Sequence, residues 1–232
     1  MSTVLITGVG HGIGKALAEA FISRGHRVIG TALSSMPTAG DPSAFPLFSL
    51  DLADTASIAS CAKSISAELA KTGGKIDILI NNAGVLLDDE ETKLFADKLR
   101  KTLEVNVVGT ADFTEQIAPL MSPNGHIVFI SSEAGSLADM DHIERSHFPY
   151  HYPAYKISKC ALNMYMRTLA ARLHHEGDGI AVSSVHPGWV KTDMGGSNAP
   201  VSPEEAASHI YDLAVSHPET GQFWFNGKKY LW

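Results

Sequence analysis

Two patterns of apolar residues alternate along this chain. Short continuous apolar runs, rich in valine, isoleucine and threonine, are typical of strands that are buried on both faces. Between them lie longer segments in which apolar residues recur at helical spacing. This alternation predicts an α/β fold with a doubly wound parallel sheet and helices on both faces. We expect seven strands, at residues 3–7, 27–31, 45–50, 76–81, 126–131, 180–186 and 222–225.

The helical segments are expected at residues 12–24, 55–71, 93–120, 155–175 and 203–215. The last one has a readable start, because Ser202 can cap it, Pro203 suits the first helical position and Glu205 completes a capping box. The Pro- and Gly-rich stretches at 36–46 and 195–203 are interpreted as loops, since another element follows each of them. We therefore expect a single domain over residues 1–232.

The composition is that of a globular protein with a full core: 232 residues, 44% of them hydrophobic and 19% charged. A formal net charge of −7 repels nucleic acid and anionic membranes, so we expect neither as a partner. A phosphate-bearing ligand would have to be held by local dipoles and a few lysines. The two cysteines, Cys61 and Cys160, lie in predicted helices and do not suggest a disulfide framework.

The start of the chain bears on location. Met1 leads directly into the first predicted strand, without the basic and then apolar segments of a signal peptide. No run approaches the roughly 18 apolar residues that a spanning helix needs. A cytoplasmic location is the resulting expectation.

A glycine-rich turn follows the first strand, in the sequence Thr-Gly-Val-Gly-His-Gly-Ile-Gly at residues 7–14. Glycines let the backbone turn sharply and approach a pyrophosphate closely. The helix that follows offers free N–H groups and the positive end of its dipole. The alternative is a tight strand–helix turn without a ligand, but the place of the turn after the first strand favours a Rossmann-type dinucleotide site.

Tyr155 and Lys159 lie four residues apart in a predicted helix, so their side chains share one face. A free phenol has a pKa of about 10, and a nearby ammonium would lower it. The pair could therefore act as an acid–base group near neutral pH. Taken alone, the same spacing also fits an ordinary amphipathic helix surface.

Two further polar residues have suggestive positions. Ser132 follows the fifth strand, and ligands of open parallel sheets bind beyond the carboxyl ends of the strands. Its hydroxyl could bind a carbonyl oxygen as negative charge develops there, whereas Ser131 better fits a turn. Asn106 stands in the middle of a largely apolar predicted helix. It is either a core amide that kinks the helix or the anchor of a water that relays protons to Lys159.

These motifs, taken together, resemble the short-chain dehydrogenase/reductase family. They are the turn at 7–14, Asn-Asn-Ala-Gly at 81–84, Asn106, Ser-x-x-Gly at 132–135, Tyr-x-x-x-Lys at 155–159 and Pro-Gly at 187–188, in family order along almost the whole chain. His-Pro-Gly-Trp-Val-Lys-Thr at 186–192 and the closing Leu-Trp are similar to the C-factor/sniffer-type carbonyl reductase branch.

The resemblance implies specific roles. Ser132 would orient a carbonyl, Tyr155 would exchange the proton, Lys159 would bind nicotinamide ribose and lower the tyrosine pKa, and Asn106 would complete a proton relay. Residues 81–84 would flank the adenosine and stabilise the sheet. The implied cofactor contacts are Gly8, Gly10, His11, Gly12, Ile13, Thr31, Asp51, Leu52, Asn82, Ala83, Gly84, Tyr155, Lys159, Pro187, Gly188, Val190 and Thr192. For Asp51 the alternative is an ordinary acid at a helix entry.

The segment between Ser132 and Tyr155 is longer than in many members of this family. It carries His142, His147, Phe148, Tyr150, His151 and Tyr152. The irregular histidine spacing argues against a metal site, and no metal is expected. We expect an aromatic wall or lid of the substrate pocket instead, with substrate loops at 136–153 and 193–203.

The end of the second strand bears on the choice of cofactor. An acidic residue there would bind the adenosine 2′-hydroxyl and repel a 2′-phosphate. The sequence has Thr31, Ser34 and Ser35 instead, which leave room for a phosphate, and His11 supplies a partial charge. We expect NADP, with NAD as the alternative.

The resulting prediction is an enzyme that transfers hydride between NADP(H) and a small carbonyl or alcohol substrate. The alternative is a nucleotide-binding regulatory or signalling protein on a reductase fold. The resemblance also implies a homodimer or tetramer, because members of this family commonly pair through two long helices, which the segments 93–120 and 155–175 could supply.

Overall fold

One sheet forms the centre of the protein in the computed structural model, which describes residues 1–33, 45–145 and 150–232, apart from the side chains of 143–145. Eight strands within this part follow the order β3-β2-β1-β4-β5-β6-β7-β8. They are β1 (Thr3–Thr7), β2 (Arg27–Ala32), β3 (Leu47–Ser49), β4 (Ile76–Asn81), β5 (Met121–Ile130), β6 (Ala181–Val185), β7 (Gln222–Phe225) and β8 (Lys228–Lys229). Strands β1 to β7 pair in parallel, as the sequence predicts.

The prediction of seven strands is wrong by one. Strand β8 pairs antiparallel with β7 at the edge of the sheet. It consists of two exposed lysines, so it has no apolar pattern to reveal it. The signal that could have found it is the Asn226-Gly227 turn, in which both residues have positive φ (46° and 72°). Such a dipeptide is the preferred connection of a tight hairpin.

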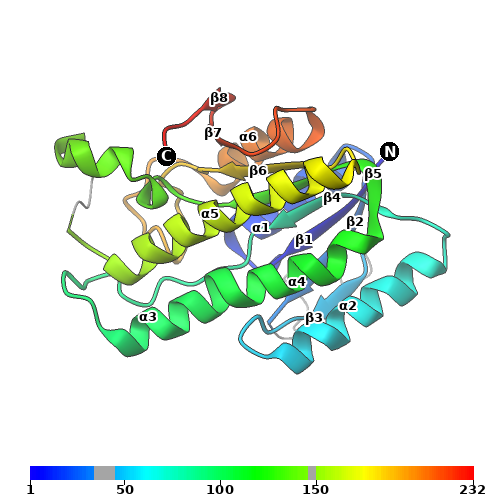
Figure 1. Ribbon diagram of the computed structural model, residues 1–232, viewed down its shortest axis with the longest axis horizontal. Coiled ribbons are helices and arrows are strands. Elements are labelled where there is room, and N and C mark those ends of the chain that lie inside the picture. Colours follow the sequence, from blue (N-terminus) through cyan, green and yellow to red (C-terminus); the bar gives the residue numbers. More distant parts are fainter. Residues whose placement is uncertain (34–44, 146–149) are drawn as a thin grey trace.

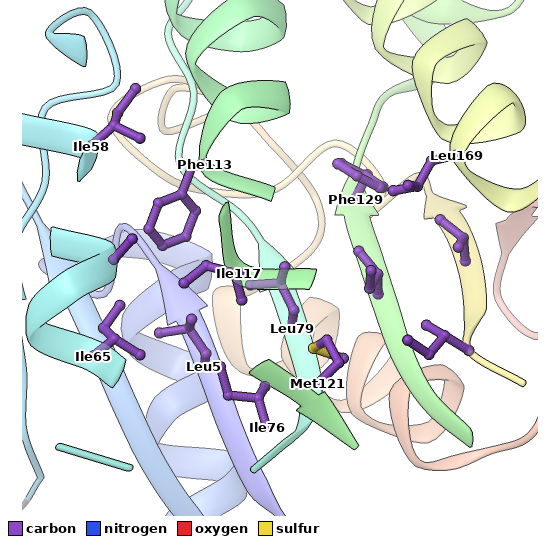
Figure 2. Packing of buried hydrophobic residues seen from close by; sticks show 14 of the residues in the cluster. Leu5, Ile58, Ile65, Ile76, Leu79, Phe113, Ile117, Met121, Phe129 and Leu169 are labelled. Carbon is purple, nitrogen blue, oxygen red and sulfur yellow. The ribbon is translucent and has the colours of Figure 1, made fainter. Parts of the chain in front are cut away.

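Helices cover both faces of the sheet (Figure 1). Helices α2 (Thr55–Ala70), α4 (Thr110–Ile117) and α5 (Pro153–Glu176) share one apolar cluster with one face of the sheet. Figure 2 shows Phe113 and Ile117 of α4 packed over Leu5 and Leu79 of the sheet. Helices α1 (Gly12–Ser23) and α6 (Pro203–Val215) form the second cluster, on the opposite face. The core is therefore two apolar layers with the sheet between them.

The segment expected as one helix over 93–120 is interrupted, which corrects the prediction. Helix α3 (Ala96–Leu103) leads into a π-helical segment, Glu104–Gly109, then into α4 and a short 3-10 turn, Ala118–Leu120. The Asn106 amide binds backbone outside the helix. A Cβ on Gly109 would lie 1.8 Å from the Leu52 carbonyl oxygen, so only glycine fits there. Tertiary contacts thus decide the local winding, and π-turns of this kind recur at functional sites.

Other boundaries differ by smaller amounts. Strand β3 is shorter than the expected 45–50, β5 begins at Met121, and α5 begins at Pro153, two residues before the predicted start. Helix α6 begins as predicted, because the Ser202 hydroxyl accepts a hydrogen bond from the Glu205 N–H at 3.1 Å.

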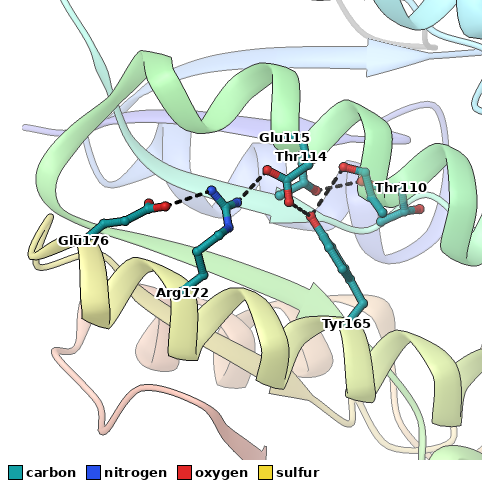
Figure 3. A network of polar contacts seen from close by, with 7 residues as sticks. Thr110, Thr114, Glu115, Tyr165, Arg172 and Glu176 are labelled. Atoms are coloured by element: carbon teal, nitrogen blue, oxygen red, sulfur yellow. Dashed lines mark hydrogen bonds and ion pairs between the residues drawn. The ribbon is translucent and has the colours of Figure 1, made fainter.

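Helices α4 and α5 are joined by a polar network on their exposed side (Figure 3). The Glu115 carboxylate accepts from the Tyr165 hydroxyl at 3.0 Å and pairs with Arg172. Arg172 also reaches Glu176 at 3.4 Å. These contacts fix the long helix α5, which carries Tyr155 and Lys159, against the rest of this layer.

The strand order reverses beside β1, whose neighbours are β2 and β4. Loops on the two sides of such a point lead away from each other and leave a crevice at the carboxyl ends of the strands. The glycine turn after β1 and residues 82–84 after β4 flank this crevice. Within the described residues, no helix combines the length and apolar character needed to cross a membrane.

Candidate active site

A cleft of about 1160 Å³ opens at the carboxyl ends of β1 to β6. The residues predicted to bind the cofactor all line it, together with Ser132: Gly8, Gly10, His11, Gly12, Ile13, Thr31, Asp51, Leu52, Asn82, Ala83, Gly84, Tyr155, Lys159, Pro187, Gly188, Val190 and Thr192. Asn106 does not line the cleft and lies buried behind it. Ser34 and Ser35 lie outside the described residues. The fold thus brings together groups that are far apart in the sequence.

The glycine turn is closed on its inner side and open toward the cleft. Gly8 and Gly12 have positive φ (71° and 55°), which favours glycine at both positions. A Cβ on Gly14 would lie 2.1 Å from the Gly8 carbonyl oxygen. A Cβ on Gly10 would meet no described atom within 4 Å. The turn therefore leaves its backbone accessible from the cleft.

Asn82 holds this turn from the neighbouring strand. Its side-chain amide donates to the carbonyl oxygens of Thr7 and Gly8 at 2.8 and 3.1 Å. In return, the Thr7 hydroxyl accepts from the backbone N–H groups of Asn82 and Ala83, both at 3.0 Å. The predicted contribution of this segment to sheet stability thus has a definite form: it cross-links the ends of β1 and β4.

The adenosine side of the cleft shows two features that bear on a ligand. The Thr31 hydroxyl is buried and has no hydrogen-bond partner among the described residues. Asp51 accepts from the Ala53 N–H at 2.8 Å, while the cap of α2 is Asp54, which accepts from the Ala56 N–H. Asp51 is therefore not the capping acid of this helix, and it lines the cleft.

Ser132 and Tyr155 converge at the inner end of the cleft. The Ser132 hydroxyl accepts from the Ala134 N–H at 3.1 Å, in the turn that follows β5. Burial raises the pKa of Tyr155 to about 12, and a hydrogen bond with Ser132 acts in the opposite direction. The two hydroxyls thus lie near each other and both residues line the cleft, although they belong to different elements.

Lys159 lies under this pair, 5% exposed, with Nζ 5.4 Å from the centroid of the Tyr155 ring. Its ammonium donates to the Ile130 carbonyl oxygen at 2.8 Å. Burial lowers the pKa of Lys159 to about 8. Burial raises the pKa of Tyr155 above that of a free phenol, and the hydrogen bond with Ser132 acts against this rise. A lowering of the Tyr155 pKa by Lys159 stays a prediction.

Asn106 occupies the π-helical segment and binds two parts of the chain at once. Its Oδ1 accepts from the Val85 N–H and its Nδ2 donates to the Val85 carbonyl, both at 2.8 Å. Nδ2 also donates to the Ser158 hydroxyl at 3.0 Å. The side chain is thus a buried amide that connects the segment after β4 to α5.

His186 and Glu133 also line the cleft, although the sequence analysis assigned neither of them a role in the site. The His186 Nδ1 accepts from the Glu133 N–H at 3.2 Å, which supports the turn directly after Ser132. The imidazole packs against Phe225, and burial lowers its pKa to about 4. The signal was the position of His186 directly after β6, at the same edge of the sheet as Ser132.

Among the described residues of the long segment between Ser132 and Tyr155, two belong to the expected aromatic wall of the cleft. His151 and Tyr152 line the cleft, and the Tyr152 ring meets the Tyr155 ring edge-on at 6.0 Å. Tyr150 is exposed. His147 and Phe148 lie outside the described residues. The chain end fixes the start of this segment, since the Trp232 carbonyl accepts from the Ala138 N–H at 2.6 Å.

A parallel sheet with reversed order at β1, a glycine turn that opens a helix, and a cleft at the strand ends together define a dinucleotide-binding α/β fold. The family described as short chain dehydrogenase matches residues 2–201. The chain belongs to this family. The sequence-based assignment, and with it the prediction of a dehydrogenase or reductase, is confirmed.

Curated relatives cover most of the chain. A 1-hydroxy-2-glutathionyl-2-methyl-3-butene dehydrogenase from Rhodococcus sp. (strain AD45) is 31% identical, over 96% of both chains. Carbonyl reductase (NADPH) 1 of Oryctolagus cuniculus is 30% identical over 79% of this chain and 78% of its own length.

Solved structures agree over the full length. The carbonyl reductase Sniffer of D. melanogaster matches with a TM-score of 0.86 and 25% identity, over 100% of both chains. A short-chain dehydrogenase/reductase from Burkholderia multivorans with bound NADP has a TM-score of 0.83 and 27% identity, over 100% of this chain and 99% of that one.

Proposed function

We propose that this protein is an NADP(H)-dependent carbonyl reductase, which transfers hydride between the cofactor and a small carbonyl or alcohol compound. The observation that carries the proposal is the gathering of Ser132, Tyr155 and Lys159 at the inner end of one cleft. The names of the relatives support it, since carbonyl reductase recurs among them. A purely regulatory nucleotide-binding role is not favoured, because these relatives are named as dehydrogenases and reductases.

The cleft fits such a cofactor. The open backbone at Gly10 and the N-terminus of α1 would hold the pyrophosphate, and the unpartnered Thr31 hydroxyl faces the region of the adenosine ribose. Residues 31–35 include no acid that would repel a 2′-phosphate, and a structural neighbour is described with bound NADP. We therefore favour NADP over NAD, with Pro187, Gly188, Val190 and Thr192 on the nicotinamide side.

The chemistry of the proposed site divides among its residues. The cofactor supplies a hydride when it is bound. With its pKa raised to about 12, the Tyr155 phenol keeps its proton at neutral pH and can donate it to the oxygen of a carbonyl that is being reduced. The Ser132 hydroxyl would bind the same oxygen, and Lys159 would hold the nicotinamide ribose. Asn106 would support the proton relay through its contact with Ser158, next to Lys159.

The direct test is NADPH oxidation, followed by absorbance, against a panel of aldehydes, ketones and quinones. Replacing Tyr155 by Phe removes the proton donor and should lower kcat by about 100-fold or more, since general acid catalysis contributes about that much. NADPH affinity, measured by fluorescence titration, should stay within about threefold because the ring remains in place.

Two outcomes would contradict the proposal. Full activity of Tyr155→Phe would exclude the assigned proton donor. Equal affinities of the wild-type protein for NADPH and NADH would exclude the interpretation of residues 31–35.

A cytoplasmic location and self-association stay predictions. Exposed Val108, Ile157 and Met164, at 53%, 42% and 67%, lie on the two segments expected to pair. Pairing of two copies there would remove apolar surface from water. The molar mass measured by light scattering during size exclusion would decide between a monomer and a dimer or tetramer.

A further inference from the structure

The start of helix α5 has an unusual construction. Tyr152, the residue before the helix, has a left-handed backbone (φ 46°, ψ 55°) and gives no side-chain cap. Pro153 takes the first helical position, and the next N–H belongs to Ala154. The first N–H groups of a helix have no partner within the helix, so a buried helix start needs one from elsewhere.

Asp88 supplies that partner from the segment that follows β4. Its Oδ2 accepts from the Ala154 N–H at 2.6 Å, a contact between residues 66 positions apart. The Asp88 side chain is buried, with 2% exposure. The same segment makes a second contact, since the Glu91 carbonyl accepts from the Tyr152 N–H at 2.9 Å. Two hydrogen bonds thus hold the first turn of α5 against residues 88–91.

A buried carboxylate is a costly way to cap a helix. It gains from the positive end of the α5 dipole and from the charge of Lys98, which pairs with Glu91 at 2.7 Å and has its pKa raised by Glu91 and, to a lesser extent, by Asp88. Its second oxygen, Oδ1, is buried without a hydrogen-bond partner among the described residues.

The position of the contact indicates its purpose. Ala154, which Asp88 holds, directly precedes Tyr155. Ser158, which Asn106 holds at 3.0 Å, directly precedes Lys159. Each proposed catalytic side chain on α5 is therefore preceded by a residue that is hydrogen-bonded to a buried polar side chain from another part of the chain.

We propose that Asp88 is a positioning residue, which fixes the first turn of α5 through Ala154 and so sets the place of the Tyr155 hydroxyl relative to Ser132. This inference rests on the proposed function, in which Tyr155 donates the proton. Asp88 does not line the cleft, so it would act on the reaction only through the position of α5. Displacement of a catalytic group by about 1 Å can cost up to about 100-fold in rate, so a loosened helix start should appear in kcat.

The test compares Asp88→Ala and Asp88→Asn with Asp54→Ala, a matched control. Asp54 caps α2 through the Ala56 N–H at 2.9 Å and does not line the cleft, so the same substitution removes the same kind of bond. Measured quantities are kcat, KM, the NADPH dissociation constant and Tm. Asp88→Ala should lower kcat at least about tenfold, with NADPH affinity within about threefold. Asp88→Asn keeps an acceptor oxygen and should stay within about threefold of wild-type kcat.

Asp54→Ala should lower Tm by roughly 2–4 °C and leave kcat unchanged. If Asp88→Ala also lowers only Tm, Asp88 is merely a structural cap and the inference is wrong. If Asp88→Ala does not fold, the variant Asp88→Glu takes its place. Its longer side chain must either displace α5 or break the hydrogen bond with the Ala154 N–H. A folded Asp88→Glu variant with wild-type kcat would equally overturn the inference. A wild-type protein that reduces no carbonyl would instead contradict the proposed function.

Discussion

Burial dominates the electrostatics of the two central residues. It raises the pKa of Tyr155 to about 12 and lowers that of Lys159 to about 8, so both neutral forms are favoured. The raised pKa of Tyr155 suits a carbonyl reductase, because the phenol must be protonated before it can donate a proton to the substrate. For Lys159, a pKa of about 8 means that the ammonium loses its charge just above neutral pH. Lys159, and not Tyr155, should therefore control the alkaline side of activity.

The first prediction concerns this alkaline side. The kcat/KM for carbonyl reduction should fall as pH rises through about 8, because Lys159 loses its positive charge above its lowered pKa. Lys159→Arg keeps a charge throughout, so its lower activity should not show this fall. Rates across pH 6 to 10, measured in buffers of constant ionic strength, would test it. A flat wild-type profile would exclude Lys159 as the titrating group.

At the scale of single elements, close contacts set the local backbone geometry of the turn between β1 and α1 and of the π-helical segment at 104–109. The turn between β1 and α1 needs glycine at some positions for packing and leaves others open. A Cβ on Gly14 would collide with the Gly8 carbonyl oxygen, whereas a Cβ on Gly10 would meet no atom of the described residues within 4 Å. Similarly, the π-helical segment at 104–109 places the Asn106 amide on Val85. The contact of Gly14 is thus made within the turn itself, whereas the geometry at 104–109 depends on a neighbour that is distant in the sequence.

A matched pair of substitutions separates these two kinds of glycine. Gly14→Ala puts a Cβ 2.1 Å from a backbone oxygen, so the turn must shift, and the free energy of unfolding should fall by about 2 kcal/mol or more. Gly10→Ala should change it by less than about 0.5 kcal/mol. Urea denaturation of both variants gives these values. If Gly14→Ala lowered the free energy of unfolding as little as Gly10→Ala, the turn would accommodate the added methyl group by relaxing.

At the scale of the whole molecule, buried histidines join elements that are far apart in the sequence. His126 on β5 contacts the Ser183 hydroxyl on β6 at 2.9 Å and the Ala214 carbonyl in α6 at 3.1 Å. His186, after β6, supports the turn that follows β5. Burial lowers the pKa of both imidazoles to about 4. Both histidines are thus neutral in the folded protein at neutral pH.

These two histidines predict a specific acid sensitivity. The unfolded chain binds their protons below about pH 6.5, while the folded protein resists until about pH 4. Their contribution to stability is therefore complete above about pH 6.5 and is lost as pH falls toward 4, by about 3 kcal/mol each. Urea denaturation at several pH values measures the loss. In the variant His126→Gln, the free energy of unfolding should fall less steeply with decreasing pH. An unchanged dependence on pH would assign the effect to other groups.

The sequence by itself determined the class of fold, the approximate positions of seven strands, the family and the candidate cofactor residues, all of which line the cleft. These rest on local signals, since apolar periodicity and short motifs need only neighbouring residues to be read. Only the tertiary structure decided the π-helical segment, the role of His186 and the contact between Asp88 and Ala154. Each depends on hydrogen bonds between residues about 20 to 70 positions apart, and no local pattern encodes such a partner. For the same reason the sequence shows the charge of Lys159 close to Tyr155, but only the folded chain shows that burial raises the Tyr155 pKa.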